Sequence, residues 1–217
     1  MVVKLISHNP DPEKNIEFCA RTCYESFERM ENDTYKKMLP VLLKNGHMSL
    51  FEHSSASFFI DEISRVCSHQ LVRHRLATFS QKSQRYVKES GFGYVVPEDI
   101  KNNPEALEVY EDAIKEIQET YEILINLGIK KEDARFIIPN AVHTTITLTA
   151  NFREWLHIID LRVNISAQWE IRELLITVWR ELYKIAPVVF SLTYFEHWSK
   201  DFEYKQKIFN KNILVNQ

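Results

Sequence analysis

The chain contains little glycine, and this scarcity excludes two common nucleotide-binding designs. Only four of its 217 residues are glycine: Gly46, Gly91, Gly93 and Gly128. Dinucleotide-binding folds and P-loops need glycines clustered at a strand-to-helix turn, and Gly91-Phe92-Gly93 lacks the rest of either pattern. Any phosphate that binds this chain must therefore be held by side chains and helix ends.

Cysteine is also scarce. Cys19, Cys23 and Cys67 are too few for a disulfide framework. Cys19 and Cys23 are four residues apart and can share one helical face, which resembles half of a metal site. Because no second cysteine pair and no His-x-x-x-His pattern follows, we predict thiols of the core or of a pocket wall, and no metal.

Long apolar runs are missing as well. No run approaches the roughly 20 residues that a membrane-spanning helix needs, and the first residues lack the apolar segment of a secretion signal. We therefore expect a cytoplasmic protein without a membrane anchor. The hydrophobic content of 45% is enough to bury a core, and we predict a single domain over residues 1–217.

Hydrophobic periodicity and turn residues predict an α+β fold in which several long helices flank a modest, mostly antiparallel sheet. Pro12 and Pro104 suit the first turn of a helix, and Gly46 and Gly128 suit helix ends. For the segment after Phe190, docking on a neighbouring subunit and fraying both remain open. Strands are predicted over residues 2–6, 54–63 and 142–149, and helices over 11–27, 33–45, 64–74, 104–127, 130–136, 152–162 and 167–185.

One long interval contains no acidic residue. It runs between Glu62 and Glu89, although the whole chain has a formal net charge of −3. Guanidinium groups with interspersed hydroxyls and amides suit phosphates and the polar edge of a base, so we interpret this interval as a nucleotide site. Its basic residues are Arg65, Arg73, Arg75, Lys82, Arg85 and Lys88, and its short polar residues are Thr78, Ser80, Gln81, Ser83 and Gln84.

The consecutive residues Arg73, His74 and Arg75 allow two explanations. On a helix they spread over about 200°, so they could reach different parts of one extended ligand or of two stacked ligands. They could also be a solvated helix end, where basic residues are favoured by the helix dipole. The acid-free surroundings favour the ligand site. A non-enzymatic nucleotide- or RNA-binding module, with these residues as a phosphate clamp, is the alternative function, although the pI near 6.3 disfavours a general nucleic-acid coat.

Two further clusters carry polar groups. His47, Glu52 and His53 follow a predicted helix end without a familiar metal-ligand spacing, so we predict a polar pocket wall. The predicted helix over 152–162 and the residue before it carry Asn151, Arg153, His157 and Arg162. The alternative there is that Arg153 and Arg162 only pair with Glu154 or Asp160 on the surface.

Arg73-His74-Arg75, followed by seven residues and then by Ser83 and Arg85-Tyr86, resembles the signature of the flavin-dependent thymidylate synthases. The resemblance extends in the right order over roughly residues 17 to 186. The flanking segments that share it are Gly46-His47, Glu52-His53, Ala134-Arg135, Asn151-x-Arg153, Leu161-Arg162 and Ala167-Gln168-Trp169-Glu170.

The resemblance implies the reductive methylation of dUMP to dTMP. Methylenetetrahydrofolate would supply the carbon, NADPH the electrons, and a tightly bound FAD would carry the hydride. The resemblance also implies a homotetramer whose active sites are shared between subunits.

The resemblance further implies contacts for individual residues. His47 stands where the family packs folate and nicotinamide over the flavin. The implied dUMP contacts are Gln70, Leu71, Val72, Arg73, Gln81, Lys82, Ser83, Gln84, Arg85, Arg135 and Arg162. The implied FAD contacts are Ser49, Arg73, His74, Arg75, Gln81, Asn151, Arg153 and His157.

This chemistry agrees with the residue types. Methylation requires C5 of the uracil to become nucleophilic, and conventional thymidylate synthases achieve this with a cysteine thiolate. The basic motif has no cysteine, and Ser83 has no evident paired base, so its hydroxyl is a poor nucleophile. We therefore assign Arg162 as the cation that polarises the uracil, Arg85 and Arg135 as nucleotide anchors, and Ser83 as an orienting group.

The chain departs from the commonest family pattern at three places. Ser80-Gln81 stands where many members have Asn-Glu, His157 stands where an asparagine is frequent, and Cys23 stands where a serine often lies beside the flavin. These departures bear on individual contacts more than on the activity.

Overall fold

The computed structural model describes residues 1–214, which fold as two compact units that are described separately. The single domain over residues 1–217 remains a prediction. No helix within residues 1–214 is long and apolar enough to cross a membrane. Unit 1 comprises Met1–Val2, Ile60–Arg73 and Ser80–Thr147, and unit 2 comprises Val3–Phe59, His74–Phe79 and the chain from Leu148 on.

The strands form one four-stranded antiparallel sheet in the order β1-β2-β4-β3, so the predicted α+β class is confirmed. Along β4, partly buried and buried residues alternate strictly, which places every second side chain on one apolar face. The opposite face is polar, and in unit 2 the hydroxyls of Ser57 and Thr149 lie 2.8 Å apart on it. The strands are β1 (Val2–His8), β2 (Ser55–Ser64), β3 (Thr78–Gln81) and β4 (His143–Asn151).

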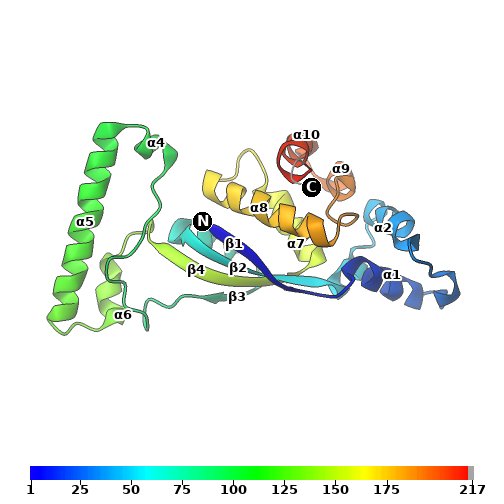
Figure 1. Cartoon of the computed structure of the whole chain (residues 1–217), viewed down its shortest axis with the longest axis horizontal. Helices are drawn as coiled ribbons and strands as arrows, with labels where there is room; N and C mark the ends of the chain where they lie inside the picture. The colour runs from blue at the N-terminus through cyan, green and yellow to red at the C-terminus, as the bar shows by residue number, and fades with distance from the viewer. Residues whose placement is uncertain (215–217) are drawn as a thin grey trace. The chain divides into compact units, whose positions relative to one another are not determined.

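The helices of unit 1 lie between residues 65 and 137, and those of unit 2 lie before and after this interval (Figure 1). Unit 1 contains α3 (Arg65–Leu71), α4 (Glu98–Lys101), α5 (Pro104–Asn126), α6 (Lys131–Ala134) and η3 (Arg135–Ile137). Unit 2 contains α1 (Pro12–Thr22), η1 (Phe27–Arg29), α2 (Thr34–Lys44), η2 (Met48–His53), α7 (Phe152–Arg162), α8 (Trp169–Ile185), α9 (Thr193–Trp198), α10 (Phe202–Ile208) and η4 (Phe209–Ile213).

In unit 1, helix α5 begins and ends as the sequence predicts. The side chain of Asn103 accepts a hydrogen bond from the Ala106 N–H, Pro104 occupies the first turn, and Gly128 follows the helix with a φ of +82°. The apolar side of α5 contributes Ile114 to a core with Phe92 and Val142.

In unit 2, α7 packs on the sheet. The indole Nε1 of Trp155 donates to the carbonyl of Ala56 at 3.1 Å, and its ring meets Phe58 edge-on at 5.1 Å. The predicted helix over 152–162 is confirmed to the residue, because Asn151 caps it and the following apolar residues match the core. Helix α8 extends this core through Trp179, whose Nε1 donates to the Phe190 carbonyl at 2.8 Å.

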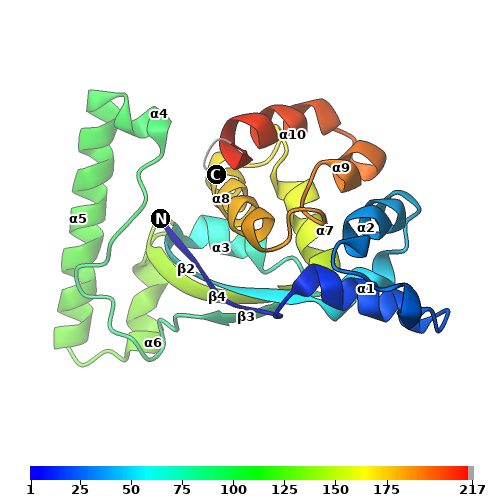
Figure 2. The same cartoon turned by 45° about the vertical axis from the view of Figure 1, so that its right-hand side comes forward.

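The segment after Phe190 packs on its own unit, and Figure 2 shows α9 and α10 beside α7 and α8. The fully buried Lys205 of α10 contacts the carboxylates of Asp160 in α7, at 3.1 Å, and of Asp201. Arg180 of α8 donates to the Asn212 carbonyl at 2.8 Å. The described part of this segment therefore does not fray, and its docking on a neighbouring subunit stays an open alternative.

Three helices are clearly shorter than predicted, and the one over 130–136 consists of the four-residue α6 followed by the 3-10 turn η3. Helix α1 ends at Thr22 and not at residue 27, because the chain turns at Glu25, which has a φ of +47°. Helix α3 ends at Leu71 and not at residue 74. His74 is 5% exposed, so the chain leaves the helix before an imidazole that belongs to the interior of unit 2.

Candidate functional site

The residues predicted to contact the two ligands fall into different units. The predicted dUMP contacts lie in unit 1, with the exception of Arg162. The predicted FAD contacts lie in unit 2, with the exceptions of Arg73 and Gln81.

Gln81 is the last residue of β3 and is held by two hydroxyls of unit 1. Its Nε2 donates to Ser68 Oγ at 2.9 Å and to Thr144 Oγ1 at 3.1 Å. Ser68 in turn donates to the Arg65 carbonyl, so the amide is fixed by a chain of hydrogen bonds. Within residues 1–214 no hydrogen bond to the Gln81 Oε1 is present, so this oxygen can accept from a ligand.

The polar run after β3 is a turn with an internal ion pair. Ser83 Oγ accepts from the Arg85 N–H at 3.3 Å, and among the described residues no base is hydrogen-bonded to this hydroxyl. Lys82 Nζ lies 2.9 Å from Oε2 of Glu89, which is only 4% exposed. Ser83 therefore acts here as an acceptor that shapes the turn, and its geometry is not that of an activated nucleophile.

Glu132 connects the two arginines predicted to anchor the nucleotide. Its carboxylate lies 2.7 Å from the Nε of Arg85, and its carbonyl accepts from the Nε of Arg135 at 3.1 Å. Arg85 also lines a surface pocket of about 510 Å³ with Lys130 and Lys131. Cations from two separated segments therefore meet on one side of unit 1.

Arg65 is a further candidate for the site, which the sequence did not single out from the other basic residues. Burial and the nearby guanidinium of Arg135 lower the pKa of Arg65. Two like charges at close range are costly unless an anion lies between them. Arg65 was visible only as one of six basic residues in the acid-free interval, and no motif set it apart.

The segment Gln70 to Arg73 presents its residues unevenly. Leu71 is fully buried, so a contact from it to a ligand would come from its backbone. Val72 and Arg73 are exposed, and the Gln70 side chain donates to the Val66 carbonyl at 3.4 Å.

In unit 2, the central contact joins Arg162 to His74. The Nε of Arg162, in the last turn of α7, donates to the Nε2 of His74 at 2.9 Å. Burial, Arg162 and His157 lower the pKa of His74 to about 4, so the imidazole is neutral at neutral pH. A neutral imidazole accepts through one nitrogen only, and here this nitrogen is Nε2.

Two further side chains of α7 surround His74. Its Nδ1 lies 3.8 Å from Oε1 of Glu154, and burial raises the pKa of that carboxyl. The ring of His157 stands edge-on to the ring of His74 with centroids 6.0 Å apart. Glu154 is a second residue that the sequence did not assign to the site.

The start of α7 carries two predicted FAD contacts. Asn151 Oδ1 accepts from the Glu154 N–H at 2.8 Å and so caps the helix. Arg153 forms an exposed ion pair with Glu52 at 2.6 Å, and not with Glu154. The alternative in which Arg153 pairs with Glu154 or Asp160 is therefore wrong, because its partner is Glu52. Arg75 is exposed.

His47 and Ser49 line a cavity of about 250 Å³ in unit 2, together with Cys23, Arg21 and Leu42. The prediction of a pocket wall is confirmed for His47. The preceding Gly46 has a φ of +72°, and an added Cβ would approach the Trp198 ring to 3.1 Å, so glycine is required there. Trp198 Nε1 donates to the Leu43 carbonyl at 2.8 Å and fixes this corner.

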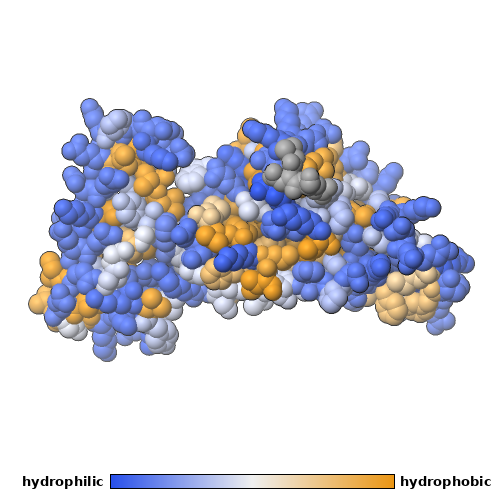
Figure 3. All heavy atoms as spheres, viewed as in Figure 1, coloured by the Kyte–Doolittle hydropathy of each residue, from blue (hydrophilic) through white to orange (hydrophobic). Residues whose placement is uncertain are grey.

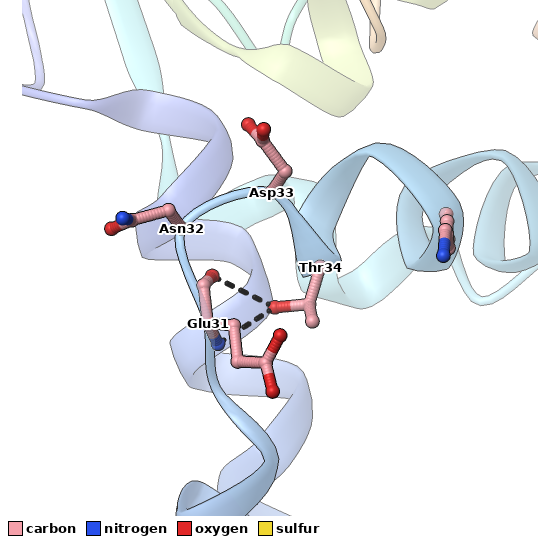
Figure 4. Close-up of a pocket in the computed structure, with 5 residues that line it drawn as sticks. Glu31, Asn32, Asp33 and Thr34 are labelled. Atoms are coloured by element: carbon pink, nitrogen blue, oxygen red, sulfur yellow. Dashed lines mark hydrogen bonds between the residues drawn. The ribbon is translucent and has the colours of Figure 1, made fainter.

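A second hollow of unit 2 lies at the loop before α2 (Figure 4). Thr34 Oγ1 donates to the Glu31 carbonyl at 3.0 Å and accepts from the Glu31 N–H at 3.1 Å. Glu31 and Asp33 make this hollow acidic, which disfavours a phosphate, and Lys37 is its only cationic lining residue. Within residues 1–214, no group of three or more His, Cys, Asp or Glu is placed to hold a metal ion.

Comparison with known proteins shows the family of the chain. The family model described as thymidylate synthase complementing protein matches residues 4–188. The flavin-dependent thymidylate synthase of Geobacter sulfurreducens is 40% identical over 88% of this chain and 85% of its own length. That of Thermococcus onnurineus is 40% identical, and that of Pyrococcus horikoshii is 42% identical, each over 85% of this chain and 78% and 79% of its own length, respectively.

A match of this length and identity shows the class of the protein, a flavoenzyme of thymidylate synthesis. The chain belongs to the flavin-dependent thymidylate synthase family. The resemblance noted in the signature is thereby confirmed, and the family's cofactor is FAD.

Proposed function

We propose that this enzyme methylates dUMP at C5 of the uracil and reduces the added carbon to a methyl group. Methylenetetrahydrofolate supplies the carbon and NADPH supplies the electrons. The observation that carries the proposal is the hydrogen bond from Arg162 Nε to a neutral, buried His74. This bond holds a permanent cation in one orientation, which is what the activation of a pyrimidine without a thiolate requires.

Arg162 acts electrostatically in this proposal. C5 of the uracil becomes nucleophilic when electron density moves into the ring, and negative charge then develops on its oxygens and nitrogens. An arginine stays protonated throughout, so it can stabilise that charge without giving up a proton. Orientation before the reaction matters, because a donor that is already in place costs no reorganisation when the charge appears.

The cysteines support a mechanism without a thiolate. Cys67 is fully buried in unit 1, and burial raises the pKa of the Cys19 thiol. Both conditions disfavour the thiolate that nucleophilic attack needs. Cys23 is exposed and lines the cavity with His47, where we assign it a place in the cavity wall.

The nucleotide is anchored by the cations of unit 1. We assign the phosphate of dUMP to Arg85 and Arg135, and we add Arg65 because of its proximity to Arg135. The remaining contacts follow the family pattern and place hydroxyl, amide and backbone groups around the sugar and base. These contacts are Gln70, Leu71, Val72, Arg73, Gln81, Lys82, Ser83 and Gln84, with Ser83 as an orienting group.

The donors of unit 2 fit a flavin nucleotide. Guanidinium, amide, imidazole and hydroxyl groups suit the diphosphate and the ring acceptors of FAD, and the cavity at His47 offers both polar and apolar walls. When bound, FAD supplies hydride transfer, which no amino-acid side chain provides. We assign its binding to Ser49, Arg73, His74, Arg75, Gln81, Asn151, Arg153 and His157, and the stacking of folate and nicotinamide to His47.

We further propose a cytoplasmic homotetramer whose active sites combine residues of several subunits. Large apolar side chains that are exposed on the single chain support an assembly where they gather into contiguous patches, since such patches mark interaction surfaces. Tyr24 is 83% exposed, Leu76 78% and Phe136 83%. In Figure 3, orange spheres gather on the visible surface of each unit.

The test of the proposed function is spectroscopic and enzymatic. The purified protein, or the protein after incubation with FAD, is expected to be yellow and to bleach when NADPH is added without oxygen. Addition of dUMP and methylenetetrahydrofolate should then yield dTMP. A colourless protein that binds dUMP but takes up no FAD would overturn the proposal and favour a non-enzymatic nucleotide-binding module.

A further inference from the structure

We propose that Glu154 is a positioning residue that holds His74 in the tautomer whose Nε2 accepts from Arg162. The structural part of this inference stands on unit 2 alone, and its consequence for turnover rests on the proposed function. It extends the site by a residue outside the signature. Glu154 lies in the first turn of α7, and Arg162 lies in the last turn of the same helix.

The geometry forms a chain of three side chains. The carboxylate of Glu154 lies 3.8 Å from the Nδ1 of His74, and the Nε2 on the other side of that ring lies 2.9 Å from Arg162 Nε. Since Arg162 Nε always carries hydrogen, Nε2 of His74 must be the nitrogen without a proton. The proton of the neutral ring is then on Nδ1 and points toward Glu154.

The opposite tautomer is unfavourable at both ends. A proton on Nε2 would face the N–H of Arg162 at 2.9 Å, and the lone pair of Nδ1 would face the carboxylate. A carboxylate that orients an imidazole in this way is a recurrent arrangement at metal and catalytic sites, where the second nitrogen binds the metal or exchanges a proton.

Burial indicates that Glu154 has a defined role. Its side chain is 5% exposed, and no hydrogen bond to its carboxylate is present within residues 1–214. Removal of a carboxyl from water disfavours its charged form, and burial accordingly raises the pKa of Glu154. The charged or titratable groups near it are His157 and Arg153 on its own helix and His74 on another segment, whose Nδ1 lies 3.8 Å from its Oε1.

The position of Glu154 in the first turn of α7 fixes its carboxylate relative to His74. Asn151 caps α7 through the N–H of Glu154, which fixes the first turn. Glu154 and Arg162 are eight positions apart on the helix, slightly more than two turns, so the helix fixes their spacing. His74, which enters from the segment before β3, lies between them and contacts both.

The first test observes the tautomer of His74 directly. In protein with ¹⁵N-labelled histidine, two-bond ¹⁵N–¹H spectra distinguish protonated from unprotonated ring nitrogens, and the His74→Asn variant assigns His74 among the eight histidines. We expect a single Nδ1–H form in the wild type and in Glu154→Gln, whose amide oxygen can still accept. In Glu154→Ala only the Arg162 bond still favours the Nδ1–H form, so we expect a minor Nε2–H form beside it. A wild-type Nε2–H form, or an unchanged single Nδ1–H form in Glu154→Ala, would overturn the proposal.

The second test observes the consequence for turnover. Glu154→Ala should lower kcat for dTMP formation by about tenfold or more, while the KM for dUMP and the bound flavin change little, and Glu154→Gln should restore most of kcat. Glu181→Ala removes a carboxylate from α8 and serves as a control with unchanged kcat. A rise in KM with constant kcat would contradict the positioning role. Absence of dTMP formation in the wild type would refute the proposed function while leaving the tautomer result valid.

Discussion

Arg162 and His74 are 88 positions apart in the sequence and are joined by a hydrogen bond of 2.9 Å between Nε and Nε2. The acceptor is a histidine that burial and two neighbouring groups keep neutral. An arginine at a helix end would ordinarily sample many orientations, since its side chain has several rotatable bonds. The bond to His74 removes much of this freedom and joins the signature motif to the cation that we propose activates the uracil.

We predict that acid destabilises the fold through His74. The folded-state pKa of about 4 lies below the ordinary value of 6.5, so between these values the unfolded chain binds the proton and the folded chain does not. The contribution of His74 is complete above pH 6.5 and falls as the pH falls toward 4, by up to about 3 kcal/mol. Glu154 acts in the opposite direction, because its folded-state pKa is raised.

An NMR titration of the His74 ring, with urea unfolding of wild type and His74→Gln between pH 7 and pH 4, measures this effect. The difference in unfolding free energy between the two proteins should shrink as the pH is lowered. Titration of His74 near 6.5 would show that the ring is not kept neutral by its surroundings.

Glu132 competes with the phosphate for Arg85, and we therefore expect Glu132→Gln to bind dUMP more tightly. The Arg85–Glu132 pair is 58% and 34% exposed, so its loss should cost stability less than about 1 kcal/mol. The KM for dUMP should fall by up to about fivefold at low salt, with a smaller change at high salt.

Glu122→Gln is the matched control, since Glu122 forms an ion pair of similar length with Lys88 in the same unit. Its KM for dUMP should stay at the wild-type value. If Glu132→Gln weakens dUMP binding, then Glu132 supports the phosphate site through its contacts to Arg85 and Arg135 and does not compete with it.

Ser83→Ala should retain measurable turnover. The hydroxyl accepts one hydrogen bond from the Arg85 N–H, and a bond of this kind contributes about 1 kcal/mol. We expect a loss of about tenfold or less in kcat/KM, measured by dTMP formation. Complete inactivity of a variant that still binds dUMP and FAD would indicate that Ser83 is a nucleophile.

Lys205→Met should destabilise unit 2 strongly. The lysine is fully buried, and its removal leaves the carboxylates of Asp160 and Asp201 without their cation. Loss of one partner from a buried ion pair costs about 3 kcal/mol, which urea unfolding can measure. Lys184→Met removes a half-exposed lysine from α8 and should cost less than about 1 kcal/mol. Similar values for the two variants would contradict this assignment.

The regular elements could be predicted where local signals were strong. The sequence predicted α5 from Pro104 and Gly128 and predicted α7 over 152–162, and the structure adds the caps at Asn103 and Asn151. The end of α3 could not be predicted, because it depends on the burial of His74, a tertiary effect that overrides local helix preference.

The site was predictable where it depends on a signature and unpredictable where it depends on packing. The basic interval and Arg162 are apparent in the sequence, and their family was confirmed by comparison. Arg65 and Glu154 were missed, because a lone arginine and a glutamate at the start of a helix are ordinary surface residues by pattern. Their roles follow from the proximity of Arg65 to Arg135 and of Glu154 to His74, which the sequence does not encode locally.

The most direct measurement of the central claim is dTMP formation by Arg162→Ala and Arg162→Lys, each loaded with FAD and saturated with dUMP. We predict that both variants keep their flavin, that Arg162→Ala loses most of its turnover, and that Arg162→Lys recovers little, since an ammonium cannot reproduce the Nε contact to His74. Turnover of Arg162→Ala at the wild-type rate would show that the uracil is activated by another group and would contradict the account.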